Sequence, residues 1–243
     1  MDSNLFKSVK EASFLLSRST LEERNRALSQ IADTLLKEKK RVMDANKRDV
    51  DAATKSGESS ALISRLKYTD EKITQSLKGL KEVAALSDPI WKGVEKREID
   101  SGFILEKVQV PIGVIGTVFE ARPDAALQIA SLSLKSGNGL ILKGGSEAGN
   151  TNRVLVDIIK EATASFSFSS NWIGALETRD DVKALLKADE WVDLIIPRGS
   201  NSFVRYIMDN THIPVLGHLR RVQVQECGCY PLCSAQNCSS HGE

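Results

Sequence analysis

Residues 114–143 read VIGTVFEARPDAALQIASLSLKSGNGLILK, and this stretch decides the fold. Apolar runs at 114–119 and 140–142 flank a segment of helical character at 123–137. Strands that are buried on both faces of a parallel sheet have such continuous apolar runs. Gly137, the last residue of this segment, sits just past the expected helix end, where a left-handed residue commonly caps a helix. The stretch therefore predicts one strand–helix–strand unit of a parallel sheet.

The same alternation continues toward the C-terminus. Further apolar runs are WIGAL at 172–176 and VDLIIP at 192–197, with a candidate fifth strand, IPVLG, at 213–217. Segments of helical character separate them, and FILEKVQVPIG at 103–113 alternates apolar and polar residues as a strand does. The pattern predicts an α/β fold with a doubly wound parallel sheet covered on both faces. It shows no internal repeat.

Residues 1–100 have a helical and polar character. Thr20 and Glu23 form a candidate capping box ahead of an apolar helix face. The segment 55–69 reads as a turn-rich connector, after which a helical pattern resumes and stops at Pro89. We expect these N-terminal helices to pack against the sheet. Residues 1–100 and 101–218 would together form one nucleotide-binding domain.

Composition excludes several classes of protein. Of the 243 residues, 41% are hydrophobic and 27% are charged, and 33 Lys and Arg nearly balance 32 Asp and Glu. That balance lacks the basic excess of a bulk nucleic-acid-binding protein. No apolar run approaches the ~20 residues that cross a bilayer, and the first residues lack the apolar core of a signal peptide. The expectation is a cytoplasmic protein with no membrane or nucleic-acid partner.

Three loops that follow predicted strands carry candidate binding residues. In an open parallel sheet, ligands bind beyond the carboxyl ends of the strands. Glycines allow close approach of a ligand, and a helix N-terminus with a nearby cation attracts anions. A nucleotide with several phosphates is the simplest ligand, although each loop taken singly is more often an ordinary turn. The three sets are Glu120, Arg122 and Asp124; Lys143, Gly144 and Gly145, with Ser146 as the expected helix cap; and Arg198, Gly199 and Ser200.

Known nucleotide-binding fingerprints are absent from these loops. No G-x-G-x-x-G occurs there, and Gly113 and Gly116 fall within the predicted strand region instead. The P-loop sequence G-x-x-x-x-G-K-[ST] is also absent. An ordinary Rossmann dehydrogenase and a P-loop nucleotidase are therefore disfavoured.

Residues 110–148, VPIGVIGTVFEARPDAALQIASLSLKSGNGLILKGGSEA, followed by VDLIIPRGS at 192–200, closely resemble the gamma-glutamyl phosphate reductase family. This family, also called glutamate-5-semialdehyde dehydrogenase, belongs to the aldehyde dehydrogenase superfamily. The helical stretches 22–36 and 45–53 fit its pattern too, so that the resemblance covers roughly residues 5–218.

The resemblance implies an oxidoreductase of proline biosynthesis. It implies NADPH-dependent reduction of L-glutamyl 5-phosphate, a small-molecule substrate, to L-glutamate 5-semialdehyde with release of phosphate. It further implies an aldehyde-dehydrogenase-like cofactor domain, a separate catalytic domain and a small strand element for homo-oligomerisation. Members of this superfamily bind the dinucleotide without a glycine fingerprint.

Position by position, the resemblance assigns roles to the three loops. Lys143 corresponds to the lysine that meets the adenosine ribose, and its charge would favour the 2′-phosphate of NADPH. The extra glycine of the Gly144–Gly145 pair leaves the register of Ser146 and Glu147 at the ribose open by one residue. Gly199 and Ser200 correspond to a Gly-Ser pair beside the pyrophosphate.

Arg122 falls near the position where aldehyde dehydrogenases keep an oxyanion-stabilising asparagine. Our hypothesis is that Arg122, together with Arg198, neutralises the acyl phosphate of the substrate. The alternative for Arg122 is an ion pair with Asp124 or Glu120.

The C-terminal stretch departs from the family pattern after His218. Family members attack the acyl phosphate with a cysteine in a Cys-Asn context, and nothing here corresponds to that catalytic domain. The four cysteines of the chain are Cys227, Cys229, Cys233 and Cys238. Their C-x-C-x3-C-x4-C spacing differs from the usual zinc knuckles.

Three interpretations of residues 219–243 follow. They are an aberrant tail from a frameshift or gene-model error, which we favour; a zinc-binding module; or a replacement nucleophile. We therefore predict no catalytic residue, no metal site and no reductase turnover from these 243 residues. The alternative function is a non-catalytic nucleotide-binding protein.

Overall fold

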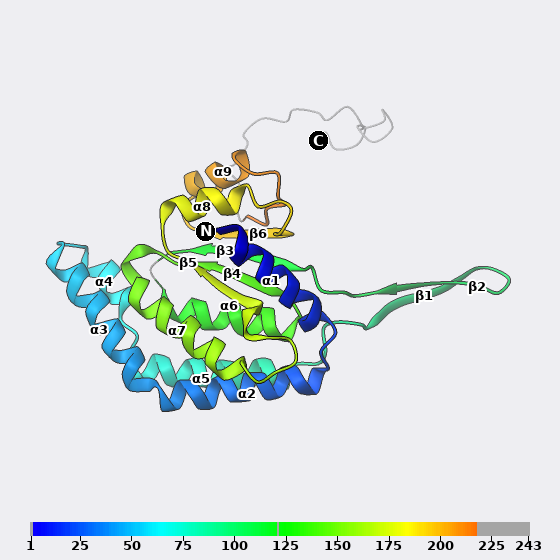
Figure 1. Ribbon diagram of the computed structural model, residues 1–243, viewed down its shortest axis with the longest axis horizontal. Helices are drawn as coiled ribbons and strands as arrows, with labels where there is room; N and C mark the ends of the chain where they lie inside the picture. The colour runs from blue at the N-terminus through cyan, green and yellow to red at the C-terminus, as the bar shows by residue number, and fades with distance from the viewer. Residues whose placement is uncertain (1, 121, 218–243) are drawn as a thin grey trace, which may run out of the picture.

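The central feature of the computed structural model, which describes residues 2–120 and 122–217, is a four-stranded parallel sheet (Figure 1). Its order is β5–β4–β3–β6, and the apolar runs that predicted strands form these strands. Every residue of β3 and β4 is buried, as continuous apolar sequence requires. The strands are β3 (Val114–Phe119), β4 (Gly139–Lys143), β5 (Ile173–Leu176) and β6 (Leu194–Arg198).

The prediction of a fifth strand at 213–217 is wrong. This segment makes one isolated parallel bridge, between Val215 and Ile195, and does not extend into a strand. Pro214 lacks a backbone N–H, so that a continuous ladder is interrupted at that point.

Two layers of helices cover the sheet, which confirms the doubly wound architecture. On one face, Leu140 and Leu142 pack in a core shared with α2, α5, α6 and α7. On the other face, Ile141 and Val118 pack in a core shared with α1, α8 and α9. The helices are α1 (Asp2–Ser17), α2 (Leu21–Lys37), α3 (Lys39–Lys55), α4 (Ser60–Leu66), α5 (Asp70–Ala85), α6 (Pro123–Lys135), α7 (Gly149–Thr163), α8 (Arg179–Leu186) and α9 (Asn201–Asp209).

Two local predictions for the N-terminal region need correction. The expected connector at 55–69 contains the short helix α4, whose N-cap Ser59 accepts a hydrogen bond from Leu62 N. The candidate capping box is half formed, because Thr20 Oγ1 accepts from Glu23 N at 3.1 Å. The Glu23 carboxylate instead accepts from Ser167 Oγ at 2.6 Å and thereby ties α2 to a distant loop.

A long antiparallel hairpin projects from the body of the molecule (Figure 1). It consists of β1 (Gly93–Asp100) and β2 (Phe103–Val108), and every residue in it is exposed. The alternating sequence from residue 103 predicted β2, whereas residues 93–100 were assigned to the helical segment and are a strand. Because both faces of this hairpin meet solvent, β1 has charged residues where a buried strand would have apolar ones. Gly102 turns the chain between the two strands with φ +78°.

The helical cap at Gly137 is confirmed, since this residue has φ +71° directly after α6. Among the described helices, none has the length and apolar character needed to cross a membrane. The division of the chain at residue 100 remains a prediction.

Candidate functional site

The strand order creates a switch in winding direction beside β3. The chain moves from β3 to β4 and β5 in one direction, then returns to place β6 on the opposite side of β3. In open α/β sheets, ligands bind outside the carboxyl ends of the strands where such a reversal occurs. Phe119 and Arg198, the last residues of β3 and β6, are paired in register at this point. Two cavities open along this edge, and Phe119 lines both of them.

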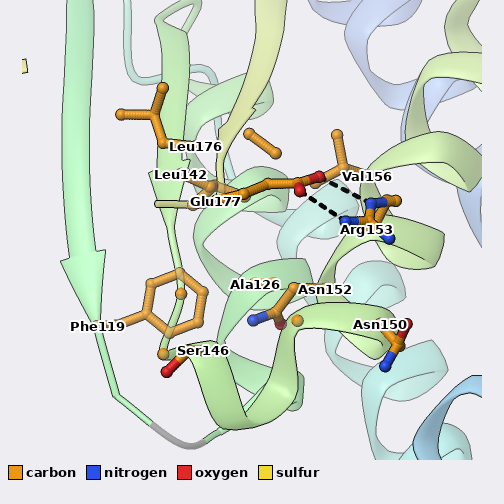
Figure 2. A pocket seen from close by; sticks show the side chains of 14 residues that line it. Phe119, Ala126, Leu142, Ser146, Asn150, Asn152, Arg153, Val156, Leu176 and Glu177 are labelled. Carbon is orange, nitrogen blue, oxygen red and sulfur yellow. Dashed lines mark hydrogen bonds and ion pairs between the residues drawn. The ribbon is translucent and has the colours of Figure 1, made fainter. Parts of the chain in front are cut away.

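The first cavity, here called the β4 cavity, has a volume of ≈ 280 Å³ and lies between the ends of β4 and β5 and the start of α7 (Figure 2). Phe119, Leu142, Val156 and Leu176 give it apolar walls. The predicted residues Gly144, Gly145 and Ser146 also line it, together with Ala126, Gly149, Asn150, Asn152, Arg153, Ala175 and Glu177.

An ion pair spans the β4 cavity on one side (Figure 2). Arg153 Nε and Nη2 donate to Glu177 Oε1 and Oε2 at 2.7 and 2.6 Å. This hydrogen bonding raises the pKa of Arg153 and lowers the pKa of Glu177. The two charges satisfy each other in a forked geometry.

Asn152 supplies a buried polar atom to the same cavity. Its Oδ1 is buried without a hydrogen-bond partner in the described part of the chain. Its Nδ2 lies so close to Gly144 that a Cβ added to this glycine would overlap it. Gly144 therefore makes room for the Asn152 amide, and a donor group on a ligand would satisfy Oδ1.

The N-terminus of α7 is already occupied by a side chain of this protein. Asp49, which is 4% exposed, accepts from Thr151 N at 2.8 Å, Thr151 Oγ1 at 2.6 Å and Asn150 Nδ2 at 2.8 Å. It also accepts from Asn150 N at 3.2 Å. The N–H groups of Asn150 and Thr151 at this helix start are thus not free for a phosphate, contrary to the expectation. The predicted cap Ser146 begins a single 3-10 turn instead, and the N-cap residue of α7 is Ala148.

Lys143 lies at the end of β4 and is 7% exposed. Its Nζ donates to the carbonyl oxygen of Gly144, and Lys143 is not among the residues that line the β4 cavity. Its contact with a ribose therefore remains a prediction.

The second cavity, here called the switch cavity, has a volume of ≈ 270 Å³ and lies at the ends of β3 and β6. The structure brings the predicted residues Arg122, Arg198 and Gly199 together there. Arg122 Nη2 lies 3.9 Å from Asp124 Oδ2, so that the alternative of an ion pair is present in loose form. The other lining residues are Arg65, Phe119, Glu120, Ala125 and Gln128.

Ser200 has a structural role that the sequence did not predict. Its Oγ accepts from Phe203 N at 3.3 Å and caps α9. Neither cavity includes it among its lining residues. Of the six predicted cofactor residues, the structure thus places Gly144, Gly145 and Ser146 in one cavity and Gly199 in the other.

The tail interpretations lie outside the described residues, because Cys227, Cys229, Cys233 and Cys238 all follow residue 217. Within 2–120 and 122–217 no group of three or more His, Cys, Asp or Glu side chains could hold a metal ion.

Four residues of the candidate site were not predicted from the sequence: Asp49, Asn152, Glu177 and Arg65. Asp49 and Thr151 are 102 residues apart, so that no local pattern connects them. Arg65 lies in a segment that reads as a connector, which concealed its position beside the strand ends. Such residues come together only in the tertiary structure.

Both the fold and the sequence of the chain are similar to those of known proteins. An NAD-dependent benzaldehyde dehydrogenase from Corynebacterium glutamicum has the same fold, with a TM-score of 0.68 at 16% identity over 89% of this chain and 45% of that chain. A gamma-glutamyl phosphate reductase from Thermotoga maritima aligns with a TM-score of 0.85 at 32% identity over 88% of this chain and 52% of that chain. No family model matches the chain.

The fold is therefore that of the aldehyde-dehydrogenase-like proteins. In sequence, the chain is 51% identical over 207 residues to the gamma-glutamyl phosphate reductase of Ruminiclostridium cellulolyticum, a match that covers 85% of this chain and 48% of that relative. The chain is homologous to gamma-glutamyl phosphate reductases and spans about half the length of the relatives that it matches. The resemblance seen in the sequence is confirmed.

Proposed function

We propose that this chain supplies the nucleotide-binding part, and one wall of the substrate site, of an NADPH-dependent reductase. The reaction is reduction of L-glutamyl 5-phosphate to L-glutamate 5-semialdehyde with release of phosphate, a step of proline biosynthesis. The observation that carries the proposal is the pair of adjacent cavities at the switch in the sheet, one with a glycine-lined wall and one with three arginines. The homology to reductases of this name supports it.

The residues of the β4 cavity fit a nucleotide. Gly144 and Gly145 expose backbone to the cavity, and the unpartnered Asn152 Oδ1 is an acceptor for a donor group of the ligand. We assign Lys143, Gly144, Gly145 and Ser146 to the adenosine side of the cofactor. Gly199 and Ser200 are assigned to its pyrophosphate. NADPH, when bound, would supply the hydride.

Arg122 and Arg198 are assigned to the phosphate of the substrate. Guanidinium groups remain charged at all relevant pH values and pair with phosphate oxygens in a forked geometry. As phosphate departs from the acyl carbon, these two charges would stabilise the leaving group. The thiolate that attacks the acyl carbon in this family has no counterpart among the described residues, so we expect the 243 residues alone to bind ligands without turnover.

We place the protein in the cytoplasm, as suits an enzyme of small-molecule biosynthesis. The hairpin β1–β2 carries exposed apolar residues, which supports the proposal that it joins further copies of the chain. Light scattering on the purified protein would measure that assembly.

A fluorescence titration tests the proposal. NADPH and, separately, NADH are added to the purified 243-residue chain, and the quenching of the intrinsic tryptophan fluorescence is followed. Saturable binding that favours NADPH is the expected result. Absence of saturable binding for both dinucleotides would contradict the proposed function. Oxidation of NADPH in the presence of glutamyl phosphate would contradict the expectation of binding without turnover and the alternative of a non-catalytic protein.

A further inference from the structure

The switch cavity has three arginines but only two carboxylates among its lining residues, so positive charge is in excess there. Arg65, Arg122 and Arg198 line a space of ≈ 270 Å³, near the ~300 Å³ lower end of small-molecule pockets. Within residues 2–120 and 122–217, Arg65 and Arg198 form no salt bridge, and the pair of Arg122 with Asp124 is at the 3.9 Å limit. The three arginines favour an anionic ligand, because Glu120 and Asp124 offset only part of their charge.

Arg65 reaches this cavity from a different layer than the other two arginines. Arg122 is the N-cap residue of α6, just after β3, and Arg198 ends β6, whereas Arg65 comes from α4. Its Nε donates to Ala61 O at 3.3 Å within its own helix. Arg65 is solvent-exposed and shares the cavity with the carboxylates of Glu120 and Asp124.

The backbone around Arg65 is firmly anchored, so that its position at the cavity is defined. The next residue, Leu66, is fully buried. Asn46 Nδ2 donates to Leu66 O at 2.8 Å, and Asn46 Oδ1 accepts from Tyr68 N at 2.8 Å. Lys72 Nζ donates to the carbonyl oxygen of Lys67 at 2.6 Å. The anchored backbone thus fixes the point from which the exposed Arg65 side chain reaches the cavity.

The cavity also contains negative charge, which restricts the ligand. Glu120 and Asp124 line it together with the three arginines. A ligand with phosphate alone would leave these carboxylates close to its own anionic oxygens. A ligand with two anionic groups and one ammonium group matches the lining, because each charge then faces its opposite.

We propose that Arg65 is a specificity-determining residue that binds the α-carboxylate of the substrate. The inference rests on the proposed function: an α-amino acid with a phosphorylated side-chain carboxyl group has two anionic ends and an ammonium group. The phosphate end lies at the strand ends with Arg122 and Arg198, adjacent to the β4 cavity. The other end points toward α4, where Arg65 holds the carboxylate and Glu120 or Asp124 holds the ammonium.

The test uses two stable probes on the 243-residue chain, measured by isothermal titration calorimetry. One probe is 2-amino-5-phosphonopentanoate, which has all three charged groups, and the other is pentylphosphonate, which has only the phosphonate. Arg65→Gln should weaken binding of the amino acid phosphonate about tenfold and leave pentylphosphonate unchanged, since a charged hydrogen bond contributes on that order. Arg122→Gln should weaken both probes.

Arg97→Gln, on the exposed hairpin, is the matched control and should change neither affinity. Arg65→Lys, which keeps the charge, should recover part of the affinity lost in Arg65→Gln. Thermal unfolding of each variant checks that the fold is retained.

Three results would overturn the inference: Arg65→Gln changes neither affinity, it weakens both probes equally, or the wild type binds neither probe. Saturable NADPH binding alongside any of these would leave the proposed nucleotide site standing. Selective loss in Arg65→Gln without NADPH binding would support the anion cavity and contradict the nucleotide proposal.

Discussion

The two cavities beside Phe119 differ in whether their arginines form close ion pairs. In the β4 cavity, Arg153 is held by two short hydrogen bonds to Glu177. In the switch cavity, Arg65 and Arg198 form no ion pair with the described residues, and Arg122 has a loose one. Paired charges fix the shape of a wall, whereas unpaired arginines around a cavity are available to an anion. Arg153 therefore helps to build the site, whereas Arg65, Arg122 and Arg198 are the side chains that we propose for ligand binding.

Asp49 gives the largest expected effect, because it fixes the helix start that forms one side of the β4 cavity. Asp49→Ala would leave four donors on Asn150 and Thr151 without their buried acceptor. We expect a loss of about 3 kcal/mol in the free energy of unfolding. Urea denaturation measures it, and Asp51→Ala, exposed on the same helix, is the control. Equal stabilities of the two variants would show that Asp49 has no structural role.

Substitution of Gly144 is expected to change the free energy of unfolding by an intermediate amount. In Gly144→Ala the added methyl group would displace the Asn152 amide, with an expected loss of about 1 kcal/mol and weaker NADPH binding. Gly79→Ala is the control, because a Cβ there meets nothing within 4 Å and α5 should gain about 1 kcal/mol. Unchanged NADPH affinity in Gly144→Ala would remove the β4 cavity from the cofactor site.

The Arg153–Glu177 pair gives the smallest effect, because both side chains are about half exposed. We expect Glu177→Gln to lower the free energy of unfolding by about 0.5 kcal/mol at neutral pH. Hydrogen bonding from Arg153 lowers the pKa of Glu177 in the folded protein, so the pair contributes fully above the ordinary glutamate pKa. The contribution is lost as the pH falls through the lowered pKa. Thermal unfolding at several pH values checks this, and a difference that grows in acid would contradict it.

The sequence predicted the sheet well, and the reason is local. Continuous apolar runs identify strands buried on both faces, and all four strands of the parallel sheet were found in this way. The strand at residues 93–100 was not predicted, because an exposed strand with charged residues on both faces has no apolar period. The prediction of a strand at 213–217 was wrong, because an apolar run does not reveal whether the segment forms continuous hydrogen bonds with a neighbouring strand.

The candidate site was predicted in part. Residues next to strand ends were found, since a parallel sheet gathers its carboxyl ends at one edge. Arg122, Arg198 and Gly199 accordingly share a cavity. Asp49 and Asn152 were missed, because their roles depend on contacts that only the tertiary structure creates. The helix start after β4 was taken for an anion site for the same reason.

Binding of inorganic phosphate tests the difference between the two cavities most directly. Calorimetric titration of phosphate into the wild type, Arg122→Ala and Arg153→Ala compares an arginine of the switch cavity with one of the β4 cavity. The account predicts that Arg122→Ala weakens phosphate binding about tenfold, and that Arg153→Ala leaves it within twofold of the wild type. Unchanged phosphate affinity in Arg122→Ala, or a larger loss in Arg153→Ala, would contradict it.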